Sequence, residues 1–348
     1  MADPNLNPDS TTTTTTTTTA DPDSPSHFHF TTVPNIFLQS LDTTDPSTFD
    51  YTKIFGLISR SYPSDPDPDP NPTPNPATQW PRLTSYITHL NSTAPNKNTR
   101  YKLLILGRHG QGLHNVAESR YGTALWDCKY SLLDGDETGS WFDARLTEVG
   151  REQARTAHAA WKTQIERGIP VPRSFYVSPL MRCCETAWIT FQGLGIGING
   201  EGEGEFRPVV KELLRETLGL HICDARSPKS TIANAYPSYK FEDGFSEEDP
   251  LHKVDLRESD SARDARFYEL LSDIWHTDEG SVISLTAHSG AITSILSVVG
   301  HRKFAVETGG VIPLLVCGEK RGGRGEERVV EPWFGRPLCP GEKSNEDE

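Results

Sequence analysis

Four short apolar segments constrain the fold of this chain more than any other feature. They lie at residues 102–106, 174–177, 282–286 and 311–316. Between them, apolar residues recur at the spacing of a helix. This pattern predicts a helix within 144–168, with Thr147 as its N-cap, and another at 180–191. Two more are predicted around Phe267–Ile274 and from Ile292 to a stop at Gly300. Strands that alternate with helices are typical of an α/β fold, a mostly parallel central sheet with helices on both faces in a three-layer α/β/α sandwich.

The composition changes along the chain and divides it into regions. The start is rich in Thr, Asp and Pro, with nine threonines in a row at 11–19, and such a segment cannot bury enough apolar surface to fold. Polar residues at 318–327 also predict a loose segment. The predicted regions are a disordered tail (1–27), an N-terminal extension that packs on the main domain (28–62), a proline-rich spacer (63–79), the main domain (80–335) and a loose acidic tail (336–348).

The charge and the cysteines exclude several classes of function. The formal net charge is −14 and the pI is about 5.3, which disfavours binding to nucleic acid or to an anionic membrane. No secretory signal and no apolar run of membrane-spanning length are visible, so we expect a cytoplasmic protein. The six cysteines form no CxxC pair and are expected to be buried free thiols. The oligomeric state is not predicted.

Polar side chains follow three of the predicted strands at the point where each strand ends. Arg108 and His109 follow the first, Arg182 stands in the helix after the second, and His288 follows the third. The carboxyl ends of parallel strands share one edge of a sheet, which is where ligands bind in open α/β folds. Helix N-termini at that edge favour anions, and arginine presents paired donors that suit a phosphoryl group. A neutral histidine can attack phosphorus as a nucleophile.

Each of these residues also has an ordinary structural explanation. His288 alone is more often a satisfied structural histidine, and Arg182 alone could be an arginine on a helix surface. The joint pattern of three junctions with matching chemistry favours a phosphate site. No aspartate-rich magnesium motif accompanies it, so positive side chains would replace a metal ion. We therefore expect no metal and no other cofactor.

With these motifs in order, the sequence resembles the histidine phosphatase superfamily, the phosphoglycerate-mutase-like proteins, and most closely a fungal phosphomutase-like branch. The resemblance covers roughly residues 80–317. The motifs that carry it are LGRHGQGLHN, DARLTEVGREQA, VSPLMRCCETA, LLRETLG and LTAHSGAI. The resemblance implies an α/β/α sandwich with a small inserted lid, which we expect within residues 116–142 and 220–265.

The resemblance also implies roles for individual residues. His109 matches the nucleophile that becomes phosphorylated. The phosphate-binding residues would be Arg108, Asn115 and Arg182, and His288 would complete the catalytic set. In the mutase-like branch the proton donor is a glutamate before a glycine in the middle of the chain. In KELLRETLG (211–219) this glutamate is Glu216, with Glu212 as the alternative and a helix-surface role open for either.

Three functions are compatible with these residues. The first is a metal-independent phosphomonoester hydrolase that works through a phosphohistidine on a small phosphorylated metabolite. The second is a cofactor-dependent phosphoglycerate-type mutase, and the third is a non-catalytic protein that binds a phosphorylated ligand. Gly112 stands where mutases usually carry serine, and 116–142 differs from the mutase segment that holds a carboxylate, so hydrolysis is favoured.

His221 and Arg226 are candidate substrate contacts, and the acidic stretch 241–250 would disfavour a polyanion. The substrate itself is not predicted.

Overall fold

A seven-stranded sheet forms the centre of the computed structural model, which describes residues 25–65, 76–196, 206–325 and 327–342. The strand order is β1-β9-β2-β8-β5-β6-β7. From β2 to β7 in this order, each strand is parallel to its neighbour. β9 is antiparallel to β2, and β1 is antiparallel to β9. The expected mostly parallel sheet is confirmed. The strands are β1 (Ser26–Thr32), β2 (Thr99–Arg108), β5 (Ser174–Val177), β6 (Val209–Val210), β7 (Lys240–Phe241), β8 (Val282–Ala287) and β9 (Val311–Gly322).

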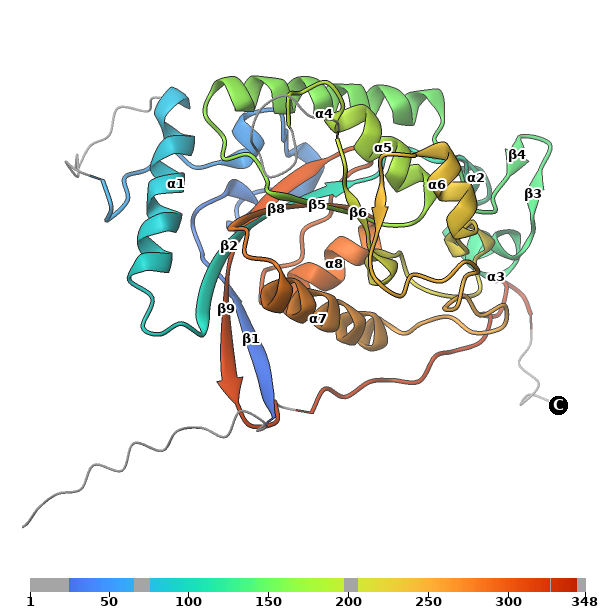
Figure 1. Cartoon of the computed structure of the whole chain (residues 1–348). Helices are drawn as coiled ribbons and strands as arrows, with labels where there is room; N and C mark the ends of the chain where they lie inside the picture. The colour runs from blue at the N-terminus through green and yellow to red at the C-terminus, as the bar shows by residue number, and fades with distance from the viewer. Residues whose placement is uncertain (1–24, 66–75, 197–205, 326, 343–348) are drawn as a thin grey trace, which may run out of the picture.

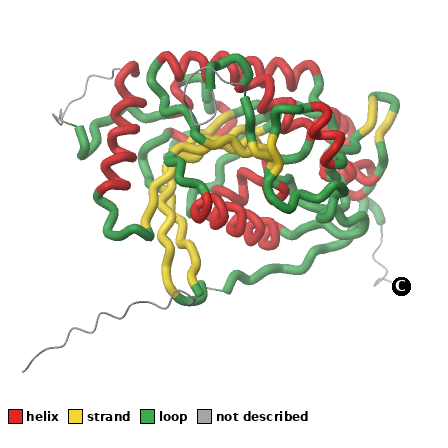
Figure 2. Tube along the Cα trace, viewed as in Figure 1, coloured by secondary structure: helices red, strands yellow, loops and turns green. Residues whose placement is uncertain are grey.

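Helices cover both faces of this sheet (Figure 1), and Figure 2 shows the same arrangement with helices in red and strands in yellow. Leu103 and Ile105 pack on one face and Leu104 and Leu106 on the other, because successive side chains of a strand point in opposite directions. This arrangement confirms the three-layer sandwich. One face carries α1 (Pro76–Ser92), α4 (Glu148–Glu166) and α5 (Met181–Phe191), and the opposite face carries α7 (Asp260–Thr277) and α8 (Ser289–Val298).

Smaller elements lie beside the carboxyl ends of the parallel strands (Figure 1). Trp126, Trp141 and Cys223 form a small apolar cluster of their own there, separate from the two large clusters against the sheet. Most of these elements lie in the ranges expected for the lid, 116–142 and 220–265, and the 3-10 turn at Glu212–Leu214 lies outside them. The elements include α2 (Leu113–Tyr121), α3 (Thr123–Cys128), a hairpin of β3 (Gly135–Asp136) and β4 (Gly139–Ser140), α6 (Lys229–Ala235), and short 3-10 turns at Tyr130–Leu132, Glu212–Leu214 and Ile222–Asp224.

The N-terminal segment of the described chain adds the outermost strand. β1 begins at Ser26, inside the tail expected for 1–27, and pairs with the second half of β9 from Gly322 to Val316. β9 therefore extends beyond residue 316, and the loose segment expected at 318–327 is wrong as far as Gly322. Backbone pairing satisfies this half of β9 despite its polar side chains. Beyond β1, 3-10 turns at Leu38–Ser40, Pro46–Thr48 and Ile54–Gly56 lead back to the core, where Phe55 lies 5.2 Å from Trp161 of α4 between ring centroids.

The expected spacer is shorter than its composition suggests. α1 begins at Pro76, within the range 63–79, and Gln79 in its first turn is buried. Asp65 forms an ion pair with Arg82 of the same helix. The threonine run at 11–19 and most of the proline-rich stretch lie outside the described residues.

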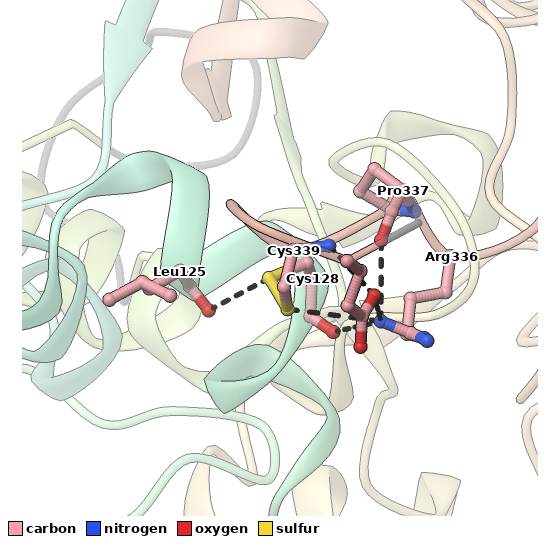
Figure 3. Close-up of a disulfide and its surroundings, with 6 residues drawn as sticks. Leu125, Cys128, Arg336, Pro337 and Cys339 are labelled. Atoms are coloured by element: carbon pink, nitrogen blue, oxygen red, sulfur yellow. Dashed lines mark hydrogen bonds and ion pairs between the residues drawn. A yellow bond between two sulfur atoms is a disulfide. The ribbon is translucent and has the colours of Figure 1, made fainter. Parts of the chain in front are cut away.

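The last described segment, residues 327–342, crosses from the end of β9 past α7 to α3 (Figure 1). The backbone carbonyl of Glu331 accepts a hydrogen bond from Ser259 Oγ at 2.8 Å, and Phe334 forms a β-bridge with Arg257. Cys339 then forms a disulfide with Cys128 at the end of α3 (Figure 3). The expectation of buried free thiols is thus wrong for this pair. Cys183, Cys184, Cys223 and Cys317 remain free.

Candidate active site

The parallel pairing of β2 and β8 brings two of the predicted residues together. Arg108 at the end of β2 is the register partner of Ala287, and His109 N donates a hydrogen bond to Ala287 O at 3.0 Å. His288 follows directly, so the rings of His109 and His288 have centroids 5.1 Å apart. The ring of His114 lies 5.5 Å from that of His109. The strand ends therefore place the predicted histidines at one edge of the sheet.

His109 is held in a defined tautomer. Its side chain is 2% exposed, and Nδ1 lies 2.7 Å from the carbonyl oxygen of Gly110. A carbonyl can only accept, so Nδ1 carries the proton and Nε2 keeps its lone pair in the neutral ring. Burial lowers the pKa of His109 well below its ordinary value, and the charge of Arg182 lowers it further. The ring is thus neutral at neutral pH, which is the form that a nucleophile requires.

A partly buried arginine, Arg108, and a fully buried one, Arg182, flank this histidine. Arg108 donates to Val306 O at 2.8 Å, and Arg182 donates to Cys223 O at 2.6 Å and to Asp224 Oδ1 at 2.9 Å. Among the described residues, the Nε atoms of both arginines are buried without a hydrogen-bond partner. A buried donor without a partner is costly and is expected where a ligand supplies the acceptor.

Asp224 holds the second arginine in place. Its Oδ2 atom accepts from Arg257 at 3.0 Å while Oδ1 accepts from Arg182. Burial alone would raise the pKa of Asp224, but Arg257 and Arg182 hold it well below the usual range. The carboxylate therefore stays charged and orients Arg182. Neither Asp224 nor Arg257 is among the residues predicted from the sequence.

A cavity of about 330 Å³ opens above these groups. Arg108, His109, Asn115 and Glu216 line it, whereas Arg182 and His288 lie buried behind its wall. A larger cavity of about 680 Å³ lies between β1 and α7 and contains none of the predicted site residues. The full lining of the smaller cavity is Arg108, His109, His114, Asn115, Glu118, Trp126, Asp127, Glu216, Thr217, His221, Cys223, Asp224, Arg257, Ser289 and Gly290.

The start of α2 positions Asn115 and explains the unusual glycine before it. Asn115 Oδ1 accepts from Gly112 N at 2.9 Å, which leaves the amide NH2 group as a donor for a ligand. A Cβ atom at Gly112 would lie 2.6 Å from Nδ1 of His114. Glycine at 112 and histidine at 114 are therefore coupled, and a serine at 112 would displace the imidazole.

The two candidate glutamates occupy different environments. Glu216 lines the cavity, and its Oε2 atom accepts from Gly290 N at 3.0 Å, at the N-terminus of α8. A Cβ atom at position 290 would lie 2.0 Å from Glu216 Oε1, so a larger residue there would displace the Glu216 carboxylate. Glu212 instead accepts from Arg226 Nε at 2.9 Å and from Arg215 at 3.1 Å, away from the cavity. Of the two, only Glu216 can reach a ligand in this cavity.

The other polar residues that the sequence singled out also separate. His221 lines the cavity, and burial lowers its pKa to about 3. Arg226 does not line it: this guanidinium is buried among Glu212 and the backbone carbonyls of 246–248. Asp249 of the acidic stretch pairs with Arg215 and accepts from Arg226 N. Arg226 and Asp249 are therefore structural.

His288 has two partners that the sequence did not indicate. Its Nε2 atom lies 2.7 Å from Ser178 Oγ and 3.4 Å from Cys183 Sγ. Ser178 follows β5, and Cys183 stands beside Arg182 in α5. Both come from the motif VSPLMRCC, but only the parallel pairing of β5 with β8 brings them to this histidine.

One group among the described residues offers three possible metal ligands within 4.8 Å of one another, namely His221, Cys223 and Asp224. Both carboxylate oxygens of Asp224 already accept from guanidinium groups. A cation at this position would be repelled by Arg182 and Arg257 at close range. The charge distribution therefore suits an anion better than a metal ion.

The buried histidines predict a loss of stability in mild acid. Burial lowers the pKa of His109, His114, His221 and His288 in the folded state. Below about pH 6.5 the unfolded chain binds protons at these positions and the folded chain does not, so stability is full above this pH and falls below it. Each histidine subtracts at most about 1.4 kcal/mol per pH unit. Urea unfolding at pH 7.5 and 5.5 measures the difference; equal free energies of unfolding would contradict it.

Comparison with known proteins agrees with the geometry. The sequence model of the histidine phosphatase superfamily (branch 1) matches residues 104–306. A probable phosphoglycerate mutase of Arthroderma benhamiae is 49% identical over 288 residues, which are 82% of this chain and 84% of that protein. Phosphomutase-like protein 3 of Candida albicans is 39% identical over 223 residues, which are 64% of this chain and 67% of that protein. Among solved structures, mycobacterial hydrolase 1 is similar over 66% of this chain and all of its own, at 18% identity and a TM-score of 0.38.

The family match covers more than half of the chain, and the relative from Arthroderma benhamiae covers most of it. The resemblance that the motifs carry, including its fungal phosphomutase-like character, is thereby confirmed. This chain belongs to the histidine phosphatase superfamily.

Proposed function

We propose that this protein is a metal-independent phosphomonoester hydrolase that acts through a phosphohistidine on a small phosphorylated metabolite. The observation that carries the proposal is the state of His109. Its Nδ1–H donates to Gly110 O, so Nε2 is unprotonated in the neutral ring. Beside this ring lie two arginines whose Nε atoms have no hydrogen-bond partner among the described residues. A nucleophile and an anion-binding group are thus preorganised at one position.

The proposed reaction has two steps. The lone pair of His109 Nε2 attacks phosphorus, and the bond from phosphorus to the ester oxygen breaks with its electron pair on that oxygen. Glu216 gives the leaving oxygen its proton. Water then attacks phosphorus, the ionised Glu216 takes up a proton from that water, and the P–N bond breaks to release inorganic phosphate. Arg108 and Asn115, which line the cavity, would hold the phosphoryl oxygens, and Arg182 and the neutral His288 would support them from directly behind the wall. Together they would do the work that a metal ion does in other phosphatases.

Glu216 predicts a specific dependence on the leaving group. Glu216→Gln removes the acidic proton and should slow alkyl phosphates by at least about a hundredfold, but p-nitrophenyl phosphate far less, because nitrophenolate leaves without a proton. The two kcat/KM values measure this difference. Glu212→Gln is the matched variant, since it removes a carboxylate of the same segment that lies outside the cavity. An equal loss on both esters for Glu216→Gln, or the selective loss in Glu212→Gln instead, would reassign the proton donor.

The mutase remains a second candidate because the relative from Arthroderma benhamiae is named a probable phosphoglycerate mutase. A screen of phosphomonoesters with and without EDTA, combined with 2,3-bisphosphoglycerate, tests the proposal. A hydrolase releases inorganic phosphate without the bisphosphate and regardless of EDTA. Isomerisation of phosphoglycerate that depends on the bisphosphate, without phosphate release, would support the mutase.

We also propose that the protein is cytoplasmic. No helix within the described part of the chain has the length and apolar character of a membrane span. The Cys128–Cys339 disulfide weighs against a strongly reducing compartment, where such bonds are rare. Thiol labelling of the protein drawn directly from cells tests the location and the state of the disulfide together. A cytoplasmic protein should show these two cysteines largely reduced.

A further inference from the structure

The cavity is divided into two halves of opposite character. The inner half holds His109 and Arg108, with Arg182 behind the wall. The outer half is formed by the second turn of α2 and by α3, and carries two carboxylates, Glu118 and Asp127. A ligand whose phosphate lies against His109 would extend its remaining part toward these two acids.

Neither outer acid forms an ion pair with a lysine or arginine of the described residues. The guanidinium charges of Arg108 and Arg257 act on Glu118 and Asp127, respectively, only from beyond ion-pair distance. Glu118 accepts a hydrogen bond from Thr123 Oγ at 3.0 Å. The ion-pair partner of Asp127 is His221, at 3.7 Å between Nε2 and Oδ1, and this ring is neutral because its pKa is lowered to about 3 by burial. Both acids are only partly buried, and among the described residues neither has a lysine or arginine partner at ion-pair distance.

The remaining cation of the cavity wall is already occupied. Arg257 donates to Asp224 Oδ2 at 3.0 Å and to the carbonyl oxygens of Gly219 and Thr217. Besides the proposed proton donor Glu216, the lining carries three carboxylates, on Glu118, Asp127 and Asp224, against two guanidinium groups, on Arg108 and Arg257. The inner arginines are needed for the phosphate, and no cation is left for a second acidic group on the ligand.

We infer that Glu118 and Asp127 select phosphate esters whose organic part carries hydroxyl or amine donors and no second acidic group. The inference rests on the proposed function and names its class of substrate. Carboxylate oxygens accept hydrogen bonds from hydroxyl and amine groups, whereas a second carboxylate or phosphate would meet like charge in a partly desolvated cavity. Glu118 and Asp127 are therefore determinants of specificity.

The test uses two phosphonates of similar size, propylphosphonate and 3-phosphonopropionate, which differ by one carboxylate. Neither has an ester oxygen that could leave, so binding is measured by calorimetry independently of turnover. The wild-type protein should bind propylphosphonate more tightly. Glu118→Gln and Asp127→Asn should each shift the ratio of the two Kd values toward 3-phosphonopropionate by about fivefold. Glu279→Gln, an exposed acid that pairs with Arg100 outside the cavity, is the control and should leave the ratio unchanged.

Two results would overturn the inference. One is tighter binding of 3-phosphonopropionate by the wild-type protein, which would mean that the outer half attracts a second anion. The other is a Kd ratio that is the same in the wild-type protein and both acid variants. Absence of phosphate release from every ester would instead overturn the proposed function, and the binding ratio would still decide the specificity of the cavity.

Discussion

His109→Ala should reduce phosphate release from any ester by at least about a thousandfold, because no other group in the cavity can take the place of the nucleophile. His288 is buried behind the wall with Nε2 against Ser178 Oγ. His114 has an unpartnered Nδ1 but is separated from His109 by 5.5 Å between ring centroids. The loss should appear in kcat, since the arginines that bind the phosphoryl group remain in place.

A second measurement identifies the lost step. Brief incubation of the wild-type protein with a labelled phosphate ester, followed by alkaline denaturation, should trap phosphate on the protein in an acid-labile bond, and His109→Ala should trap none. His89→Ala provides the control, because His89 is exposed on α1 outside the cavity. Undiminished turnover by His109→Ala would remove this residue from the mechanism, and full cellular function of the same variant would revive a non-catalytic role.

The sequence predicted the inner half of the cavity because that half is built from local patterns. The apolar run before Arg108 fixes a strand, and the helical spacing after Ser289 fixes a helix. Once both strands belong to a parallel sheet, their last residues must meet at the same edge. Arg108 and His288 could therefore be placed without knowledge of the loops between them.

The network that holds Arg182 could not be predicted in the same way. Asp224 and Arg257 come from a segment without periodic apolar residues, so no local pattern shows that Asp224 binds both Arg182 and Arg257. A buried arginine needs a partner, but any of several acids in that segment could have provided it. Glu212 and Asp249 are two further acids near this segment, and they pair with Arg226 and Arg215 instead.

The strand β9 shows a related limit. Its second half is polar, and a strand with exposed polar side chains cannot be distinguished from a loop by composition. β1 decides the outcome, because it offers a complete set of backbone partners from Ser26 to Thr32. Pairing between segments almost 300 residues apart is a property of the folded chain and leaves no trace in either segment alone.

The Cys128–Cys339 disulfide belongs to the same class of long-range contacts and has consequences for the cavity. Cys128 follows Trp126 and Asp127, which line the cavity, and Arg336 donates to Cys128 O at 3.3 Å (Figure 3). The same C-terminal segment forms a β-bridge with Arg257, which also lines the cavity. The disulfide therefore fastens the end of the chain across two parts of the cavity wall.

Loss of this disulfide should lower the free energy of unfolding by several kcal/mol. The two cysteines are 211 residues apart, and closing a loop of this length in the unfolded chain corresponds to about 5 kcal/mol in the chain-entropy treatment, which is an upper value. Urea unfolding of the oxidised protein and of Cys128→Ser/Cys339→Ser measures the difference.

Cys317→Ser is the matched control for this double variant, since Cys317 is free, half-buried and distant from α3. Dithiothreitol should destabilise the wild-type protein and have no effect on the double variant, because only the former has a bond to reduce. A difference below about 1 kcal/mol between the oxidised protein and the double variant would show that the C-terminal segment stays in place through Arg257, Ser259 and Arg336 alone. A full loss would show that these hydrogen bonds depend on the covalent link, and that reduction loosens the wall beside Asp127.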